Sequence, residues 1–200
     1  MKKKNIIQAP LGETKVLLHT CCAPCSSAII EAMLASGITP VIYYCNPNIY
    51  PQKEYEIRKE ECTRYAQALG LEIVDADYDH DNWLAQMCGL ENEQERGGRC
   101  LKCFKLRLLR TARYAAQRGI KVITTTLASS RWKSLDQINE AGQWACGQIK
   151  NEIPPESEVI WWDQNWRKGG LQERRLQIIK EYDFYNQLYC GCEFSMRSSL

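Results

Sequence analysis

Three short segments of this sequence each carry two or three cysteines, a residue type that supplies thiolates for metal binding or redox chemistry. The segments are Cys21-Cys22-Ala23-Pro24-Cys25, Cys100-Leu101-Lys102-Cys103 and Cys190-Gly191-Cys192. Cysteines three positions apart at the start of a helix project to the same side, where the positive end of the helix is expected to lower the pKa of their thiols. Because thiolate is the form that binds metal, the spacing predicts one centre built from all three segments.

Three kinds of centre use thiols in this way, and they differ in how many they need. A tetrahedral zinc site takes four and leaves three without a role, and a Cys-x-x-Cys redox pair takes two. An iron-sulfur cluster takes four, and the Pro, Gly and small residues beside these cysteines let backbone N–H groups approach the inorganic sulfides. One cluster with a second metal or a substrate-facing thiolate accounts for all of the thiols. The pattern therefore favours iron-sulfur and leaves zinc and dithiol redox chemistry open.

The remaining cysteines stand alone in the sequence. They are Cys45, Cys62, Cys88 and Cys146. We interpret them as buried small apolar residues. The total of eleven is odd and the chain is not small, which argues against the disulfide scaffold of a secreted protein. After Met1 and three lysines the apolar run at 16–18 is too short for an export signal or a membrane span, so we expect a cytoplasmic protein without membrane contact.

The overall composition is that of a globular protein, with 44% apolar and 25% charged residues among 200. We expect a single domain over residues 1–200. The net charge of +2 is too small to indicate nucleic-acid binding by itself, but residues 100–118 are basic with no acidic residue to offset them. The cations are Lys102, Lys105, Arg107, Arg110, Arg113 and Arg118. This segment predicts either a solvated helix face or a surface that contacts phosphates.

The elements that must position the cysteines alternate along the chain. Apolar and β-branched runs predict strands at 15–20, 40–45, 71–75, 121–126 and 159–163. Helical spacing of apolar residues predicts helices at 26–36, 52–69, 81–87, 100–118, 136–150 and 171–189. Strands separated by helices indicate a Rossmann-like α/β fold, a doubly wound, mainly parallel sheet flanked by helices. Ligands bind such sheets beyond the carboxyl ends of the strands, which places residues 21–25, 46–48 and 124–130 at the predicted site.

Several of these segments, taken in order, resemble one enzyme family. They are residues 17–26, 44–49, 97–104, 124–127 and 189–195, with Glu54, Tyr55, Arg58 and Arg107 between them. This set resembles the QueH family of cobalamin-independent epoxyqueuosine reductases over nearly the whole chain. The resemblance implies an iron-sulfur oxidoreductase that reduces the epoxide of epoxyqueuosine, at the tRNA wobble position, to the alkene of queuosine. The reaction takes two electrons and two protons and releases water.

The resemblance also implies cofactors and partners. A 4Fe-4S cluster would deliver electrons singly, and an adjacent mononuclear iron would polarise the epoxide oxygen. On this hypothesis Cys21 or Cys22 holds the cluster together with three cysteines distant in sequence. These three are Cys100, Cys103 and Cys190. The second iron and the catalytic role fall to Cys22, Cys25 and Cys192. Some family members carry aspartate at the position of Cys25, so the resemblance implies either a different ligand set for the second metal or a different metal preference. The expected partners are tRNA carrying epoxyqueuosine and an unidentified low-potential electron donor.

Other polar residues give weaker signals. Asn46 and Asn48 bind substrate or form an ordinary turn, and Arg58 and Arg107 contact either tRNA or the protein itself. His19 lies in a strand and is interpreted as a core histidine, and Asp79 as the cap of the 81–87 helix rather than a proton donor. Arg167 and Lys168 could extend a tRNA surface. The tryptophans that could stack on bases, but mostly suit the core, are Trp132, Trp161, Trp162 and Trp166.

Two other functions compete with this one. A zinc-stabilised tRNA-binding protein without redox activity would use the same cysteines. A nucleotide-activating sulfur transferase needs a glycine-rich phosphate loop after the first strand, and the segment at 21–25 offers none.

Overall fold

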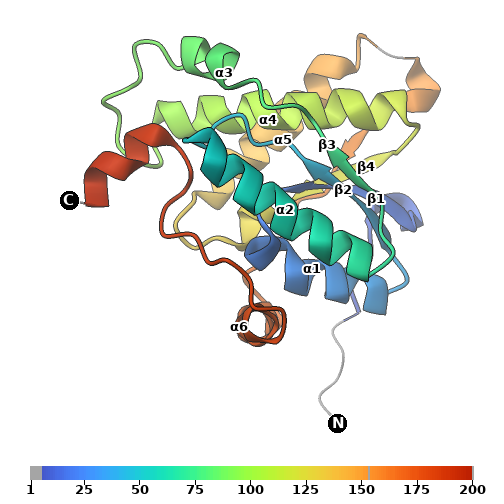
Figure 1. Ribbon diagram of the computed structural model, residues 1–200. Helices are drawn as coiled ribbons and strands as arrows, with labels where there is room; N and C mark the ends of the chain where they lie inside the picture. The colour runs from blue at the N-terminus through green and yellow to red at the C-terminus, as the bar shows by residue number, and fades with distance from the viewer. Residues whose placement is uncertain (1–5, 153, 200) are drawn as a thin grey trace.

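A five-stranded parallel sheet forms the centre of the protein (Figure 1). In the computed structural model, which describes residues 6–152 and 154–199, the strand order is β3-β2-β1-β4-β5. The strands are β1 (Lys15–Thr20), β2 (Thr39–Tyr44), β3 (Ile73–Asp75), β4 (Val122–Thr125) and β5 (Ile160–Trp161). Leu18 of β1 lies opposite Ile42 of β2 and Thr124 of β4. The predicted Rossmann-like α/β class with a parallel sheet is confirmed.

Helices cover both faces of this sheet (Figure 1). They are α1 (Ala23–Ala35), α2 (Gln52–Ala68), α3 (His80–Gln86), α4 (Gly98–Gln117), α5 (Leu135–Ile149) and α6 (Leu171–Glu181). α4 packs against α5 on one side of the sheet, and α1 packs against α2 and α6 on the other. Because neighbours cover the central strand on both faces, its residues Val16, Leu17 and Leu18 are all apolar and fully buried.

The order in which the strands enter the sheet reverses beside β1. The chain passes from β1 through α1 to β2 on one side, whereas β4 joins β1 on the other side. At such a reversal the loops beyond the carboxyl ends of the strands diverge and leave a crevice, which is where proteins of this architecture bind ligands. The loop that follows β1 begins at Cys21, so the first cysteine group lies at the crevice.

Helix α1 begins three residues before its predicted start at Ser26. Pro24 occupies the first turn of the helix, where its fixed φ suits the helix and its missing N–H costs nothing. Cys22 is therefore the N-cap residue, and Cys25 lies inside the first turn. The early start brings the sulfur of Cys25 close to the loop that carries Cys21.

The last helix is shorter than predicted. The sequence predicts a helix over 171–189, but α6 ends at Glu181. Asp183 has a φ of +50°, a left-handed conformation that ends a helix, and the backbone N–H of Phe184 donates to the carbonyl of Ile179 at 3.0 Å. Residues 182–192 consequently form an irregular segment that leads from α6 to Cys190 and Cys192 (Figure 1).

The isolated cysteines and the tryptophans divide between core and surface. Cys45 and Cys62 are buried as predicted, but Cys146 is half-buried and Cys88 is exposed, so the burial prediction is wrong for Cys88. Trp162 and Trp166 pack edge to face in the core, which confirms the core interpretation for them. Trp132 is 66% exposed. Within the described part of the chain, no helix is long and apolar enough to cross a membrane.

Candidate metal centre

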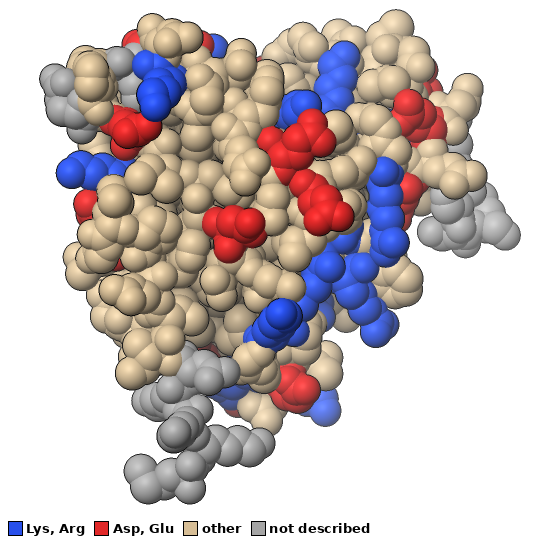
Figure 2. Space-filling model, turned by 180° about the vertical axis from the view of Figure 1, so that it is seen from behind, with Lys and Arg blue, Asp and Glu red and all other residues tan. Residues whose placement is uncertain are grey.

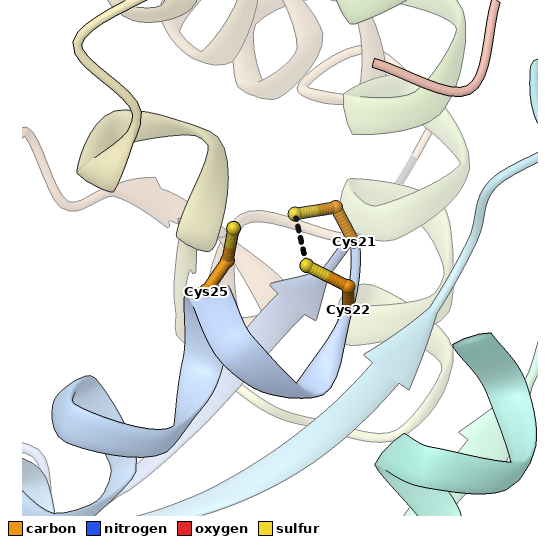
Figure 3. A group of neighbouring side chains, drawn as sticks. All are labelled: Cys21, Cys22 and Cys25. Atoms are coloured by element: carbon orange, nitrogen blue, oxygen red, sulfur yellow. Dashed lines mark hydrogen bonds between the residues drawn. The ribbon is translucent and has the colours of Figure 1, made fainter. Parts of the chain in front are cut away.

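The first cysteine group converges on one point at the carboxyl end of β1 (Figure 3). The sulfur atoms of Cys21, Cys22 and Cys25 all lie within 4.8 Å of one another, and those of Cys21 and Cys22 are 3.8 Å apart. Cys21 and Cys22 come from the turn between β1 and α1, and Cys25 reaches toward them from the helix (Figure 3). Three thiols at this spacing can share a single metal ion.

All three cysteine segments reach one cavity of about 850 Å³. The thiol-bearing residues that line it are Cys21, Cys25, Cys100, Cys103, Cys190 and Cys192. Cys22 lies just behind this wall, 1% exposed, where its sulfur accepts a hydrogen bond from Gln187 Nε2 at 2.8 Å. Segments separated by about 80 residues or more in the sequence therefore meet at one place, with space for an inorganic centre and part of a substrate.

The loop at Cys190 is held against α2 by a buried arginine. Arg58, only 2% exposed, pairs with Glu54 at 2.7 Å and donates to the carbonyls of Cys190 at 3.2 Å and Tyr189 at 3.3 Å. Gly191 lies in the tightest part of the loop, with a φ of +104° that favours glycine, and a Cβ there would lie 2.9 Å from a side-chain carbon of Ile49. These contacts fix the direction from which Cys190 and Cys192 enter the cavity.

The second cysteine pair lies on the first two turns of α4. Gly97 is the N-cap, and Glu93 accepts a hydrogen bond from the backbone N–H of Arg99 at 2.9 Å. The buried Arg99 guanidinium donates to backbone carbonyls of the loop before the helix, including Glu91 at 2.9 Å. The backbone N–H of Arg96 donates to the sulfur of Cys100 at 3.3 Å, a contact that stabilises a thiolate.

The thiols differ in how their pKa values shift. Hydrogen bonds from Cys22 and Cys25 hold the pKa of Cys21 well below its usual value, whereas burial raises the pKa of Cys22 far above it. The hydrogen bond to Cys21 raises the pKa of Cys25 to about 12. Burial likewise raises the pKa of Cys100 and Cys103. The prediction that helix N-termini lower these pKa values is wrong for Cys22, Cys25, Cys100 and Cys103, where desolvation and shared protons outweigh the helix. The lowered pKa of Cys21 comes from its thiol neighbours.

Arg107 and Asn46 tie the strand ends together beneath the cavity. Arg107 is buried and donates to the carbonyl of Cys45 at 3.1 Å and to Asn46 Oδ1 at 2.5 Å. Asn46 in turn donates to the carbonyl of Thr20 at 2.9 Å. His19 Nε2 donates to the same Cys45 carbonyl at 3.0 Å, and burial lowers the pKa of His19 to about 3. His19 is thus a neutral core histidine, as its place in a strand predicts.

Asn46 and Asn48 both line the cavity, but they differ in their side-chain oxygens. Oδ1 of Asn46 accepts from Arg107, whereas Oδ1 of Asn48 is available to a ligand. Asn48 is 2% exposed, and its buried Oδ1 has no hydrogen-bond partner among the residues that the structure describes. A buried acceptor left unpaired costs free energy unless a ligand satisfies it. Asp79, in contrast, is the N-cap residue of α3 but makes no side-chain cap hydrogen bond, so the capping prediction is wrong. Its carboxylate accepts from Asn82 at 2.9 Å instead.

Five of the six cations predicted on the basic helix α4 are paired or buried. Lys105 pairs with Glu140 at 2.7 Å, Arg113 with Glu152 at 2.9 Å, and Arg118 with Glu72 at 2.9 Å. Arg110 donates to the carbonyl of Ala76, and Arg107 is buried. The absence of acidic residues in this stretch of sequence is therefore misleading, because other elements supply the carboxylates.

The cavity itself has cations that the sequence did not single out. Lys133 lines it, and although burial lowers its pKa, the neighbouring thiols of Cys190, Cys21 and Cys25 more than compensate, so the pKa is raised above its usual value. Lys133 belongs to the loop directly after residues 124–130, the segment predicted to reach the site from β4. Its closeness in sequence to the end of β4 is the signal that could have identified Lys133.

Comparison with known proteins finds one enzyme family. A family model described as "Epoxyqueuosine reductase QueH" matches residues 16–198. A protein named epoxyqueuosine reductase QueH from Histophilus somni is 47% identical over 193 residues, covering 96% of this chain and 76% of that protein. The protein of the same name from Haemophilus influenzae is 48% identical over 193 residues, with the same coverage. That from Acinetobacter baylyi is 45% identical over 200 residues, covering 100% of this chain and 88% of the relative.

Proposed function

The chain belongs to the epoxyqueuosine reductase QueH family, and we propose that it reduces the epoxide of epoxyqueuosine in tRNA to the alkene of queuosine at an iron-sulfur centre in the cysteine-lined cavity. The observation that carries the proposal is that thiols from three distant segments line this one cavity. A 4Fe-4S cluster would supply electrons one at a time, and an adjacent iron would act as a Lewis acid toward the epoxide oxygen.

The donor set fits such a centre. Seven thiols are available, more than the four that either a cluster or a zinc site requires, and six of them line the cavity. We propose that the cluster is held by Cys21 or Cys22 together with cysteines of the other two segments. These are Cys100, Cys103 and Cys190. Cys22, Cys25 and Cys192 are the proposed ligands of the second iron; Cys22 and Cys25 lie close enough to share one ion, as each also does with Cys21.

The polar residues of the cavity divide into two roles in this proposal. Asn48 offers its unpaired Oδ1 to an N–H or O–H group of the modified base. Arg58 donates to the carbonyls of Cys190 and Tyr189, and Arg107 donates to the Cys45 carbonyl and to Asn46, so we propose that they act by positioning Cys190 and Asn46. Lys133 places a positive charge beside the thiols and would offset part of the negative charge of an anionic centre.

The test is anaerobic purification followed by iron and sulfide analysis and by turnover of tRNA that carries epoxyqueuosine, with a low-potential chemical reductant in place of the unidentified donor. We expect a brown protein that forms queuosine, detected by mass spectrometry of the digested tRNA. Cys100→Ser should lose cluster iron and activity, whereas Cys88→Ser, at an exposed cysteine outside the cavity, is the matched control. A colourless protein with stoichiometric zinc and no turnover would support the zinc-stabilised RNA-binding alternative.

A further inference from the structure

The mouth of the cavity is bordered by large apolar side chains that face solvent. Trp132 is 66% exposed, Leu176 is 58% exposed and Leu188 is 96% exposed, and all three line the cavity. Exposed apolar groups scattered singly over a surface are ordinary, but a group around a functional cavity marks a contact surface. The three come from separate parts of the chain, so the fold gathers them.

The Trp132 ring is exposed while its backbone is firmly held. Arg96 donates to the carbonyls of Trp132 and Arg131, both at 3.0 Å, and Arg167 donates to the carbonyl of Lys133 at 2.7 Å. The guanidinium of Arg131 lies over the Trp132 ring, 5.0 Å from its centre. An indole fixed in this way gives a flat stacking surface that loses little conformational entropy on binding.

The charge around the cavity is strongly positive. Eight of the lining side chains that the structure describes are lysine or arginine, and Glu95 is the one carboxylate among them. Arg58 is paired with Glu54 behind the lining, which leaves seven cations beside one carboxylate. Figure 2 shows a band of lysine and arginine side chains across the face turned away in Figure 1, with carboxylates beside its upper part. On α4, in contrast, Lys105 and Arg113 are paired with acids. The unbalanced positive charge is therefore at the cavity.

We infer that this border is the platform for the nucleotides next to the modified base: Trp132 stacks on a neighbouring base of the single-stranded anticodon loop, while its phosphates are contacted by the exposed Arg131 and the half-buried Arg175, which both line the cavity. Base stacking on aromatic side chains combined with a basic groove is the usual way to bind single-stranded RNA without reading its sequence. The inference rests on the proposed function, because it takes tRNA as the polymer whose base enters the cavity. It moves the RNA surface from α4 to the 131–133 loop.

The probe for the test is a fluorescently labelled RNA hairpin that mimics an anticodon stem-loop with guanosine at the wobble position, so that no turnover occurs. Fluorescence anisotropy with the holoprotein gives Kd at several salt concentrations. Trp132→Ala should raise Kd roughly 5- to 150-fold, which corresponds to about 1–3 kcal/mol for one stacked base. Trp132→Phe, which keeps a ring, should lose less. Arg131→Gln should lower the slope of log Kd against log salt by about 0.7 for one phosphate.

Two variants at exposed positions outside the cavity are matched controls. Leu84→Ala removes a 38% exposed apolar side chain of α3, and Lys150→Gln removes an exposed cation, and both should keep the parental Kd. Visible absorbance and iron content should stay at parental values in Trp132→Ala, because among the residues that the structure describes no hydrogen bond joins Trp132 to a thiol.

Three results would overturn the inference. The first is a parental Kd and salt slope in both Trp132→Ala and Arg131→Gln. The second is a loss of hairpin affinity in Lys105→Gln alone, which would return the surface to α4. The third is that Trp132→Ala and Arg131→Gln keep the parental hairpin affinity but are reduced more slowly by a protein electron donor. That result would make the border a protein-docking site. Hairpin binding through Trp132 in a protein that fails to reduce epoxyqueuosine would refute the proposed function and leave this inference standing.

Discussion

Replacement of Arg58 by lysine tests whether the C-terminal cysteine segment helps to retain the metal. Arg58 is 2% exposed and bonds two backbone carbonyls of this segment, at Cys190 and Tyr189. Lysine keeps the charge that pairs with Glu54, but one ammonium group cannot reproduce the geometry of the guanidinium fork. Hydrogen bonds from a charged group contribute about 1.5–3 kcal/mol each, so loss of both weakens the docking of the segment by about 3–6 kcal/mol.

A weakening of about 3 kcal/mol raises the open population of the segment roughly 150-fold, since about 1.4 kcal/mol corresponds to a tenfold change. The assay is the anaerobic rate of iron release to a coloured chelator, with circular dichroism to verify folding. We expect release from Arg58→Lys to be on the order of 100-fold faster if segment opening precedes release. Arg64→Lys is the matched control, because Arg64 lies on the same helix and donates to the carbonyl of Tyr182 but does not contact Cys190. Equal release rates in the two variants and the parent would refute the reasoning.

Three further predictions concern the same cavity. Gly191→Ala should lower iron content, because its φ of +104° and a contact at 2.9 Å leave no space for a Cβ, whereas Gly147→Ala, with nothing within 4 Å of the added Cβ, should keep the parental iron content. Asn48→Ala should raise KM for tRNA that carries epoxyqueuosine about 2- to 10-fold while iron content stays constant, since a lost hydrogen bond contributes about 0.5–1.5 kcal/mol; a parental KM would remove Asn48 from the substrate site. Removal of metal by a chelator should speed proteolytic cleavage near the 96% exposed Leu188, and identical cleavage of metal-loaded and metal-free protein would show that the metal does not hold this segment.

The strands and the place of the first cysteine group follow from local sequence. β1 was predicted at its observed bounds, and its buried centre over residues 16–18 is apolar, which occurs when helices cover both faces of a strand. A parallel sheet then requires the residues after β1, β2 and β4 to share one edge. Cys21 and Asn48 both lie in that region and line the cavity. The general rule for parallel sheets was sufficient here because it depends on topology and not on side-chain detail.

The errors have a common physical cause, which is that distant residues decided them. The helical pattern over 171–189 continues past Glu181, but the turn at Asp183 allows the ring of Phe184 to pack against Tyr65 of α2. Likewise the sequence of α4 contains no carboxylate to neutralise its cations, yet Arg113 pairs with Glu152, 39 residues away. Periodicity and local charge describe one element at a time, so they miss contacts made after the elements assemble.

The positive lining of the cavity answers two separate electrostatic requirements of the proposed function. A thiolate-bound cluster is an anionic group, and burial raises the pKa of Cys22 and Cys103 in this site. Metal binding must therefore displace protons from thiols that do not ionise readily. Lys133, close to the thiols, supplies charge that favours the thiolate form. Arg131 at the mouth is exposed, where it can meet phosphates that approach from solvent. Neutralisation of the inner charge should therefore affect metal retention first, and neutralisation of the outer charge should affect RNA affinity alone.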